Sequence, residues 1–388
     1  MKVADRISRI QPSITLEMTA KAAELRKKGL DVINLSVGEP DFETPQNIKE
    51  AAFNAIKKGA TKYTAGAGTP ELKSAIISKL KRDNNLHYNN ENIIVSCGGK
   101  HSLYNACQVL FQKNDEVIIF SPYWVSFPDF ISITGATPVV VPTIAENRYE
   151  PDFDILEQEI NSNTKGIIVN SPSNPTGGVW RDEAIKRVLE IAKKHNIWVF
   201  SDECYEQLTY DSPFTSIQNY DLNNNKILTF QSCSKTYCMT GWRIGYTAGH
   251  KDIIKAMSKL QSQSTSCPNS IAQEAAIEAL IGDQGAIKMM KSAFQRRRDF
   301  IVQELNLIDG IQCEKPGGAF YVFPSFKKLT NNNKIKSAGD LCFNLLKNQY
   351  IASVPGKSFG SNDNIRFSYA ISSERIKLAI QKIKEVLK

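Results

Sequence analysis

The chain has 388 residues, of which 41% are hydrophobic and 23% are charged, and its formal net charge is +8. This length exceeds what one hydrophobic core usually serves, so we expect one large domain with a smaller one attached. Lysine and arginine are dispersed among acidic residues, which argues against nucleic acid as a partner, and no apolar run reaches the roughly 18 residues of a membrane span.

The first residues and the cysteines bear on the compartment of the protein. Residues 1–11 mix charges with valine and isoleucine and contain no small-residue cleavage site, so no secretory signal is visible and a cytoplasmic location is expected. The eight cysteines form no C-x-x-C pair, and only four histidines accompany them. This scatter predicts reduced thiols and argues against a disulfide framework or a metal site.

The middle of the chain, residues 92–248, alternates short apolar runs with amphipathic stretches. The runs are β-branched and do not alternate with polar residues, which is typical of strands buried on both faces; they cover residues 93–96, 117–120, 166–169, 197–200 and 227–230. Between two of these runs, apolar residues recur at helical spacing, namely Ile185, Val188, Leu189 and Ala192. This pattern predicts βαβ units and a mostly parallel sheet flanked by helices.

The two ends of the chain look different from this middle region. A strand-like run opens at Lys315, three asparagines at residues 331–333 mark a loop, and residues 365–368 alternate apolar with polar. We therefore expect an α/β protein whose large domain covers residues 46–300. A smaller α/β domain would combine the N-terminal segment, residues 1–45, with the C-terminal part, residues 301–388.

The residues that follow the apolar runs are unusually polar. In open α/β sheets, ligands bind beyond the carboxyl ends of the strands, so these residues are the ones to examine. They are Gly98-Gly99-Lys100, Ser121-Pro122-Tyr123-Trp124, residues 170–178, Asp202-Glu203-Cys204-Tyr205 and residues 232–235.

One stretch carries a family resemblance, namely Ser232-Cys233-Ser234-Lys235 followed by Met239-Thr240-Gly241-Trp242-Arg243. Here the sequence resembles the fold-type I pyridoxal 5′-phosphate (PLP) enzymes, specifically the class I aminotransferases, with the prokaryotic-type aspartate aminotransferases nearest. The resemblance runs from about Ser8 to near the end of the chain. It also includes residues 36–42, 121–126, 170–177 and 201–203.

The resemblance implies the roles of five residues around the cofactor ring. Lys235 would carry PLP as a Schiff base and then move a proton as general acid and base. Asp202 would hold the pyridine nitrogen protonated, although an aspartate in a turn after a strand is by itself typical of a helix cap. Tyr205 and Asn174 would hydrogen-bond the phenolic oxygen of PLP. Trp124 would stack on its ring, and Asn174 and Trp124 would also line the substrate site.

A second group of residues would hold the cofactor phosphate. Gly98-Gly99 follows a strand and opens a helix, where backbone N–H groups bind phosphate. By resemblance, Ser232 and Ser234 add hydroxyl donors and Arg243 adds a charged fork. Tyr63 matches a tyrosine that reaches the phosphate from the partner subunit, so the resemblance implies a homodimer with composite active sites.

The substrate would be held by charged side chains. Arg366 is the expected partner of the substrate α-carboxylate, because a guanidinium presents two parallel donors, and the backbone of Gly38 would share that carboxylate. Lys100, with Ser13 and Thr15 nearby by resemblance, favours a second carboxylate on the substrate. The alternative for Lys100 is a solvated residue in the first turn of a helix, which the helix dipole disfavours without excluding it.

The leading functional interpretation is transamination between L-aspartate and 2-oxoglutarate. The alternatives on the same scaffold are an aminotransferase for aromatic amino acids, alanine or kynurenine, or a β-elimination. Relatives that also use prephenate often carry lysine before Pro-Ser, whereas this chain has Gln11-Pro12-Ser13, so we expect prephenate to be a poor acceptor. A non-enzymatic regulator is disfavoured by the intact set of Asp202, Lys235 and Arg366.

Overall fold

The computed structural model describes residues 3–12 and 14–387. Its α-helices are α1 (Ile14–Lys27), α2 (Gln46–Lys57), α3 (Pro70–Asn84), α4 (Gly99–Leu110), α5 (Phe127–Ser132), α6 (Phe153–Gln158), α7 (Asp182–Lys194), α8 (Cys233–Thr236), α9 (Lys251–Ser262), α10 (Ser270–Ile281), α11 (Gly285–Asn306), α12 (Lys327–Asn331), α13 (Ala338–Gln349) and α14 (Ser373–Leu387). Its strands are β1 (Ile33–Asn34), β2 (Ile93–Ser96), β3 (Glu116–Ser121), β4 (Thr137–Pro142), β5 (Thr164–Asn170), β6 (Trp198–Asp202), β7 (Ile227–Ser232), β8 (Gly245–Ala248), β9 (Tyr321–Val322), β10 (Ile351–Ala352), β11 (Val354–Pro355) and β12 (Ile365–Ser368).

A seven-stranded sheet forms the centre of the molecule, in the order β2-β8-β7-β6-β5-β3-β4. Strands β4, β3, β5, β6 and β7 pair in parallel, whereas β8 is antiparallel to both of its neighbours. The five predicted strands are therefore confirmed, and so is the mostly parallel sheet. The sequence did not indicate β4, whose prolines Pro138 and Pro142 are tolerated because it lies at the edge of the sheet.

Both faces of this sheet are buried, which explains why its strands do not alternate apolar with polar residues. One face packs against α4, α5 and α9 through residues such as Val117, Ile119 and Ile168. The opposite face packs against α6 and α7 through Ile118, Ile167 and their neighbours. The predicted helical stripe is confirmed, since its residues are buried in α7: Ile185, Val188, Leu189 and Ala192.

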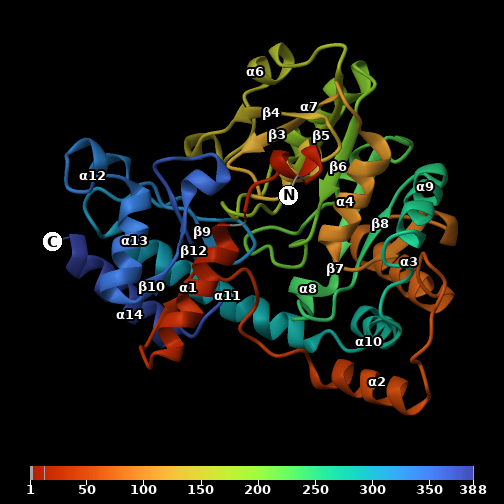
Figure 1. Cartoon of the computed structure of the whole chain (residues 1–388), viewed down its shortest axis with the longest axis horizontal. Helices are drawn as coiled ribbons and strands as arrows, with labels where there is room; N and C mark the ends of the chain where they lie inside the picture. Colours follow the sequence, from red (N-terminus) through yellow and green to blue (C-terminus); the bar gives the residue numbers. More distant parts are fainter. Residues whose placement is uncertain (1–2, 13, 388) are drawn as a thin grey trace.

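A smaller lobe combines the two ends of the chain, and we call it the small lobe: β1, β9–β12, α1 and α12–α14. Its antiparallel sheet has the order β11-β12-β9, and β1 pairs in parallel with β10. In Figure 1, α1 (red) lies among the blue C-terminal helices, and Met18 of α1 packs with Leu346 of α13. The predicted α/β architecture with a second, composite lobe is confirmed.

Two details of the small lobe differ from the sequence expectations. The strand-like run that opens at Lys315 is a strand only at Tyr321–Val322, because the preceding residues cross over to the loop after β5, where Gly318 N donates to Gly177 O at 2.9 Å. Of the three asparagines at residues 331–333, the first still belongs to α12.

The predicted boundary at residue 300 lies inside α11, which is continuous from Gly285 to Asn306. Within this helix Ile287 packs with the core around α2, α3 and α10, whereas Met290 and Phe294 already pack with the core of the small lobe. The boundaries of the two domains stay a prediction. Among residues 3–12 and 14–387, every helix is too short or too polar to cross a lipid bilayer.

Candidate active site

A cavity of ≈360 Å³ lies beyond the carboxyl ends of β5, β6 and β7, at the start of α4. The small lobe closes one side of it. Its lining comprises Gly38, Gly99, Lys100, Leu103, Trp124, Val125, Asn170, Asn174, Asp202, Cys204, Tyr205, Ser232, Ser234, Lys235, Arg243, Tyr321 and Arg366. Most of the residues selected from the sequence therefore meet in one place, since the ends of neighbouring parallel strands converge there.

Two of the predicted residues that the structure describes are not part of this lining, namely Tyr63 and Gly98. Tyr63 is 89% exposed. The backbone of Thr15 belongs to α1, and Ser13 lies outside the described residues. Gly98, which was predicted together with Gly99, is the N-cap residue of α4.

Lys235 lies in the short helix α8, directly after β7. Ser232 caps this helix, because its hydroxyl accepts a hydrogen bond from Ser234 N at 3.0 Å. The Lys235 ammonium group donates to the carbonyl of Gly38, which belongs to the segment after β1. Burial lowers the pKa of Lys235, and the cation of Arg243 lowers it further. A lysine in such a setting is more often the neutral amine, which is the nucleophilic form.

Asp202 ends β6 and is buried without an ion-pair partner among the described residues. Burial raises the pKa of this carboxyl group to about 7, and only weak contacts oppose the effect, chiefly a hydrogen bond from Cys204 N at 3.2 Å. A cation placed beside such a buried carboxyl group favours the carboxylate form, and the carboxylate in turn stabilises the cation.

The raised pKa of Asp202 predicts how stability depends on pH. In the cofactor-free protein the native state binds more protons than the unfolded state between about pH 4 and pH 7, so the free energy of unfolding should fall as the pH rises through this window. Asp202→Asn should flatten this slope by up to about 1.4 kcal/mol per pH unit. Urea unfolding of the unmodified protein and of the variant across this pH window measures the two slopes. Identical slopes would contradict a raised pKa of Asp202.

Arg366 of β12 is a buried cation, and the part of the chain that the structure describes offers it no counter-charge. Its Nη1 donates to Asn174 Oδ1 at 2.9 Å and its Nη2 donates to Ser36 O at 2.6 Å, while its Nε has no partner. Burial lowers its pKa, and the faces of Tyr321 and Phe359 lie 4.6 and 5.1 Å from the guanidinium carbon. A buried guanidinium with a free donor and no carboxylate fits an anionic ligand.

Arg243 lines another part of the cavity, beside the N-terminus of α4. It donates to Thr240 O at 2.9 Å and to Cys97 O at 3.3 Å, and its own φ of 59° is left-handed. Glycine suits position 98, because its φ of 91° is one that L side chains rarely adopt, and a Cβ there would also meet the Arg243 guanidinium. The hydroxyls of Ser232 and Ser234 line the same cavity. Backbone N–H groups of a helix start, two hydroxyls and a guanidinium together form a site for a phosphate group.

Lys100 is the second residue of α4, and its ammonium lies 5.0 Å from the ring centre of Trp124. Burial lowers the pKa of Lys100, and Arg243 lowers it further, whereas Asp129 opposes the shift. No carboxylate within the described part of the chain forms an ion pair with Lys100. The cavity thus contains two separate cations, Lys100 and Arg366, that are free to bind carboxylates.

The sequence interpretation missed several lining residues, and Tyr321 is the most important of them. Its hydroxyl lies 2.8 Å from the hydroxyl of Tyr205, and its side chain is fully buried. The signal was weak, because an aromatic residue in an apolar strand is more often core. Asn170 and Cys204 were within the polar segments examined but received no role, and they too line the cavity.

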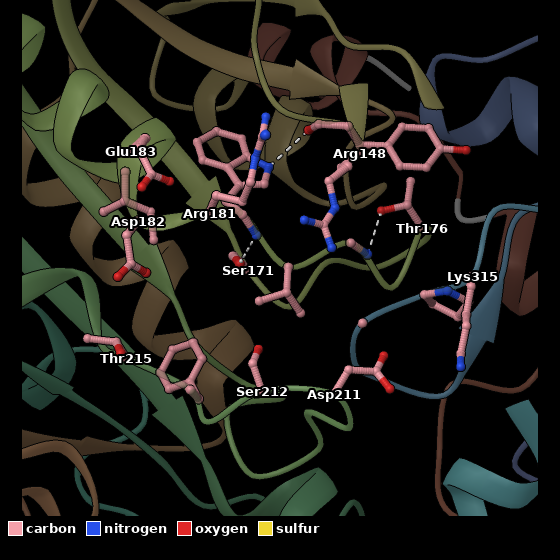
Figure 2. A pocket seen from close by; sticks show the side chains of 18 of the residues that line it. Arg148, Ser171, Thr176, Arg181, Asp182, Glu183, Asp211, Ser212, Thr215 and Lys315 are labelled. Atoms are coloured by element: carbon pink, nitrogen blue, oxygen red, sulfur yellow. Dashed lines mark hydrogen bonds between the residues drawn. The ribbon is translucent and has the colours of Figure 1, made fainter. Parts of the chain in front are cut away.

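A second cavity of ≈330 Å³ lies on the other side of the segment that carries Asn174. Figure 2 shows Arg148 directed into this space, with Asp211 and Lys315 at its edge. None of the residues selected from the sequence for a cofactor or substrate role lines it. Its lining mixes acidic with basic side chains, and these mostly face solvent. The first cavity is therefore the candidate active site.

The charges of the candidate site fit PLP. Asp202 suits a protonated ring nitrogen, and the end of the cavity with Arg243, Ser232 and Ser234 suits a phosphate. Lys235 lines the same cavity. A mostly parallel α/β sheet with a composite small lobe and a lysine in such a cavity defines the class of PLP-dependent enzymes of fold type I.

Comparison with known proteins makes the assignment specific. The chain belongs to the family "Aminotransferase class I and II", whose model matches residues 30–383. It is an aminotransferase, and its cofactor is PLP. It is 44% identical over 386 residues to an aspartate aminotransferase of Bacillus subtilis, covering 99% of this chain and 98% of the relative.

Two further relatives span the whole chain. An aspartate/prephenate aminotransferase of Cereibacter sphaeroides is 44% identical over 395 residues, with 98% of this chain and 97% of the relative covered. Among solved structures, the aspartate aminotransferase of Thermus thermophilus with maleate has a TM-score of 0.95 and 38% identity, with 100% of both chains covered. Both the fold and the domain content are thus shared with these enzymes over their full length.

Proposed function

We propose that this enzyme transfers the amino group of L-aspartate to 2-oxoglutarate, which yields oxaloacetate and L-glutamate. The observation that carries this proposal is the pair of cations Arg366 and Lys100, which line one cavity and form no ion pair with a carboxylate among the described residues. Both substrates are dicarboxylic, so each would place one carboxylate on each cation. The names of the relatives, aspartate aminotransferases among them, support the same choice.

The residues that would hold the cofactor follow from the charges of the cavity. Asp202 would keep its ring nitrogen protonated, Tyr205 and Asn174 would bind its ring oxygen, and Trp124 would stack on its ring. The start of α4 at Gly99, together with Ser232, Ser234 and Arg243, would bind its phosphate. When bound, PLP supplies an electron sink that stabilises negative charge at the substrate Cα.

Lys235 and Arg366 would act directly on the substrate. The amine of Lys235 would remove the proton from the substrate Cα and later donate a proton to the carbon on the other side of the transferred nitrogen, as general base and then as general acid. Arg366 and the backbone of Gly38 orient the α-carboxylate so that the Cα–H bond faces Lys235. Because Gly38 and Arg366 belong to segments that close the cavity from the small lobe, their engagement by substrate would also exclude water.

We propose in addition that the enzyme is a homodimer in which Tyr63 completes the partner's phosphate site. Tyr63 is 89% exposed, and Phe53 and Ile56 of the nearby α2 are 62% and 49% exposed. Large apolar side chains exposed together are typical of an interaction surface. Sedimentation analysis of the PLP-loaded enzyme measures the assembly directly, and a monomer at working concentration would refute this part of the proposal.

The substrate pair is tested by single half-reactions of the PLP-loaded enzyme, read from the absorbance of the cofactor. Aspartate and glutamate should convert it, whereas tyrosine, phenylalanine, alanine and kynurenine should convert it much more slowly. Conversion by an aromatic donor but not by aspartate would overturn the proposal. Prephenate belongs in the acceptor panel and is expected to be a poor acceptor. Relatives that use prephenate often carry lysine where this chain has Gln11, and glutamine supplies no cation. The backbone N–H of Gln11 donates to Asp129 Oδ1 at 3.2 Å.

The role of Lys100 gives a quantitative prediction. Lys100→Met should lower kcat/KM for aspartate by about 10- to 100-fold, because one charge-assisted contact to the distal carboxylate is lost. The value for alanine, which has no distal carboxylate, should change by less than about 3-fold. Lys73→Met is the matched control, since Lys73 is a half-buried lysine of α3 outside the cavity. Equal losses for aspartate and alanine would show that Lys100 does not select the dicarboxylic substrate.

A further inference from the structure

The hydroxyl groups of Tyr205 and Tyr321 form a pair at the junction of the two lobes. They lie 2.8 Å apart, and neither hydroxyl has another hydrogen-bond partner among the described residues. Tyr205 follows β6 in the large sheet, and Tyr321 belongs to β9 in the small lobe. Tyr205 is 4% exposed and Tyr321 is fully buried, so solvent does not compete for this hydrogen bond.

Tyr321 also contacts both groups that would bind the substrate carboxylate. Its ring lies 4.6 Å from the guanidinium carbon of Arg366. A Cβ at Gly38 would come within 2.9 Å of the Tyr321 hydroxyl, so the absence of a side chain at Gly38 leaves room for that hydroxyl. Tyr205 and Gly38 therefore border the Tyr321 hydroxyl, and Arg366 lies against its ring.

Each phenol has a single proton, so only one of the two tyrosines can donate within the pair. Burial raises the pKa of both groups, and the cation of Arg366 opposes this shift in both. Because Tyr205 would give its one proton to the ring oxygen of the cofactor, it can only accept within the pair, and Tyr321 must donate. When it donates, the proton of Tyr205 is left free to point into the cavity.

We propose that Tyr321 is a positioning residue that donates a hydrogen bond to Tyr205 and thereby commits the Tyr205 proton to the ring oxygen of the cofactor. This inference rests on the proposed function, in which Tyr205 binds that oxygen. A phenol that accepts a hydrogen bond is a stronger donor, because hydrogen bonds in a chain polarise one another. In this scheme Tyr321 acts on the ring oxygen through Tyr205 and touches no reacting atom.

The expected effect is a shift in a titration of the PLP-loaded enzyme, followed by its visible absorbance without substrate. A proton is shared between the Lys235 nitrogen and the ring oxygen, and a strong donor to that oxygen makes the nitrogen less basic. Tyr321→Phe should therefore raise the pH midpoint of the absorbance change by about 0.5 to 1 unit, the size of one net hydrogen bond. Tyr205→Phe should raise it by more.

The double variant Tyr205→Phe/Tyr321→Phe separates the possible explanations. If Tyr321 acts through Tyr205, the double variant has the same midpoint as Tyr205→Phe alone. A shift by Tyr321→Phe of equal size in both backgrounds would overturn the proposal, and so would an unchanged midpoint in Tyr321→Phe while Tyr205→Phe shifts. If neither variant shifts the midpoint, the assignment of Tyr205 to the ring oxygen is wrong, and this proposal falls with it.

Two further variants guard against a merely structural effect. Tyr369→Phe is the matched control, because Tyr369 is a fully buried tyrosine that donates to Ala319 O at 3.1 Å and does not line the cavity. It should leave the midpoint unchanged. Gly38→Ala keeps the Tyr321 hydroxyl but should displace it, so it should raise the midpoint in the same direction and add no further shift in the Tyr321→Phe background. Additive shifts in that pair would count against the proposal.

Discussion

Replacing Lys235 with alanine is expected to lower kcat for transamination by about 10⁴-fold or more, because the variant loses both the nucleophile and the general base. Burial lowers the pKa of Lys235, which favours its neutral amine. No other lysine lines the cavity within the described chain apart from Lys100, which lies against Trp124. A substitute base is therefore not at hand.

Single-turnover kinetics with aspartate measures this loss, and the visible absorbance of the unmodified enzyme should be absent or shifted in Lys235→Ala. Lys235→Arg is the informative control. It keeps a positive charge of similar reach, but a guanidinium does not give up its proton in proteins, so activity should stay lost. Activity in Lys235→Arg within about 10-fold of the unmodified enzyme would mean that the charge, and not the amine, is what the reaction needs.

Lys79→Met should destabilise the fold by about 3–5 kcal/mol, because it removes one partner of a buried ion pair. Lys79 is 1% exposed, and its ammonium donates to Glu206, to Asn84 Oδ1 at 2.8 Å and to Gln231 Oε1 at 2.8 Å. Without Lys79, the carboxylate of Glu206 stays buried with only amide donors among the described residues, namely Asn84 Nδ2 at 2.6 Å, Gln231 Nε2 at 3.0 Å and Gln207 Nε2 at 3.4 Å.

Urea unfolding of the PLP-loaded enzyme measures the effect. Lys21→Met is the control, since Lys21 forms an exposed pair with Glu17 at 2.7 Å and should cost less than about 1 kcal/mol. The double variant Lys79→Met/Glu206→Gln should recover part of the loss, because the unpaired charge is gone. A Lys79→Met protein no less stable than Lys21→Met would show that water or a rearranged network compensates the buried charge.

The location of this network suggests a structural purpose. Gln231 directly precedes Ser232, and Glu206 directly follows Tyr205, so the network joins the two segments that carry the proposed cofactor residues. Glu203 adds a further anchor, since its Oε1 accepts from Ser201 and Ser216 at 2.8 and 2.7 Å. Polar networks that are fully satisfied make such segments rigid, which is what a preformed site requires.

The site residues that could be predicted from the sequence share one property, which is that each lies in a short segment next to a strand end. Asp202 and Lys235 follow β6 and β7, and Gly99 opens the helix after β2. The parallel strands were recognisable from their apolar runs, and parallel strands bring their carboxyl ends to one edge of the sheet. Local pattern and the general rule of α/β sheets were therefore enough to place these residues in one cavity.

By itself, then, the sequence determined the fold class, the succession of the main strands along the chain and the group of residues at the sheet edge. All of these depend on local pattern. Only the tertiary structure decided which distant side chains meet. Tyr205 and Tyr321 are 116 residues apart, Lys79 and Glu206 are 127 apart, and Arg366 reaches the carbonyl of Ser36 across 330 residues. No local signal encodes such contacts, since they arise only when segments distant in the sequence pack against one another.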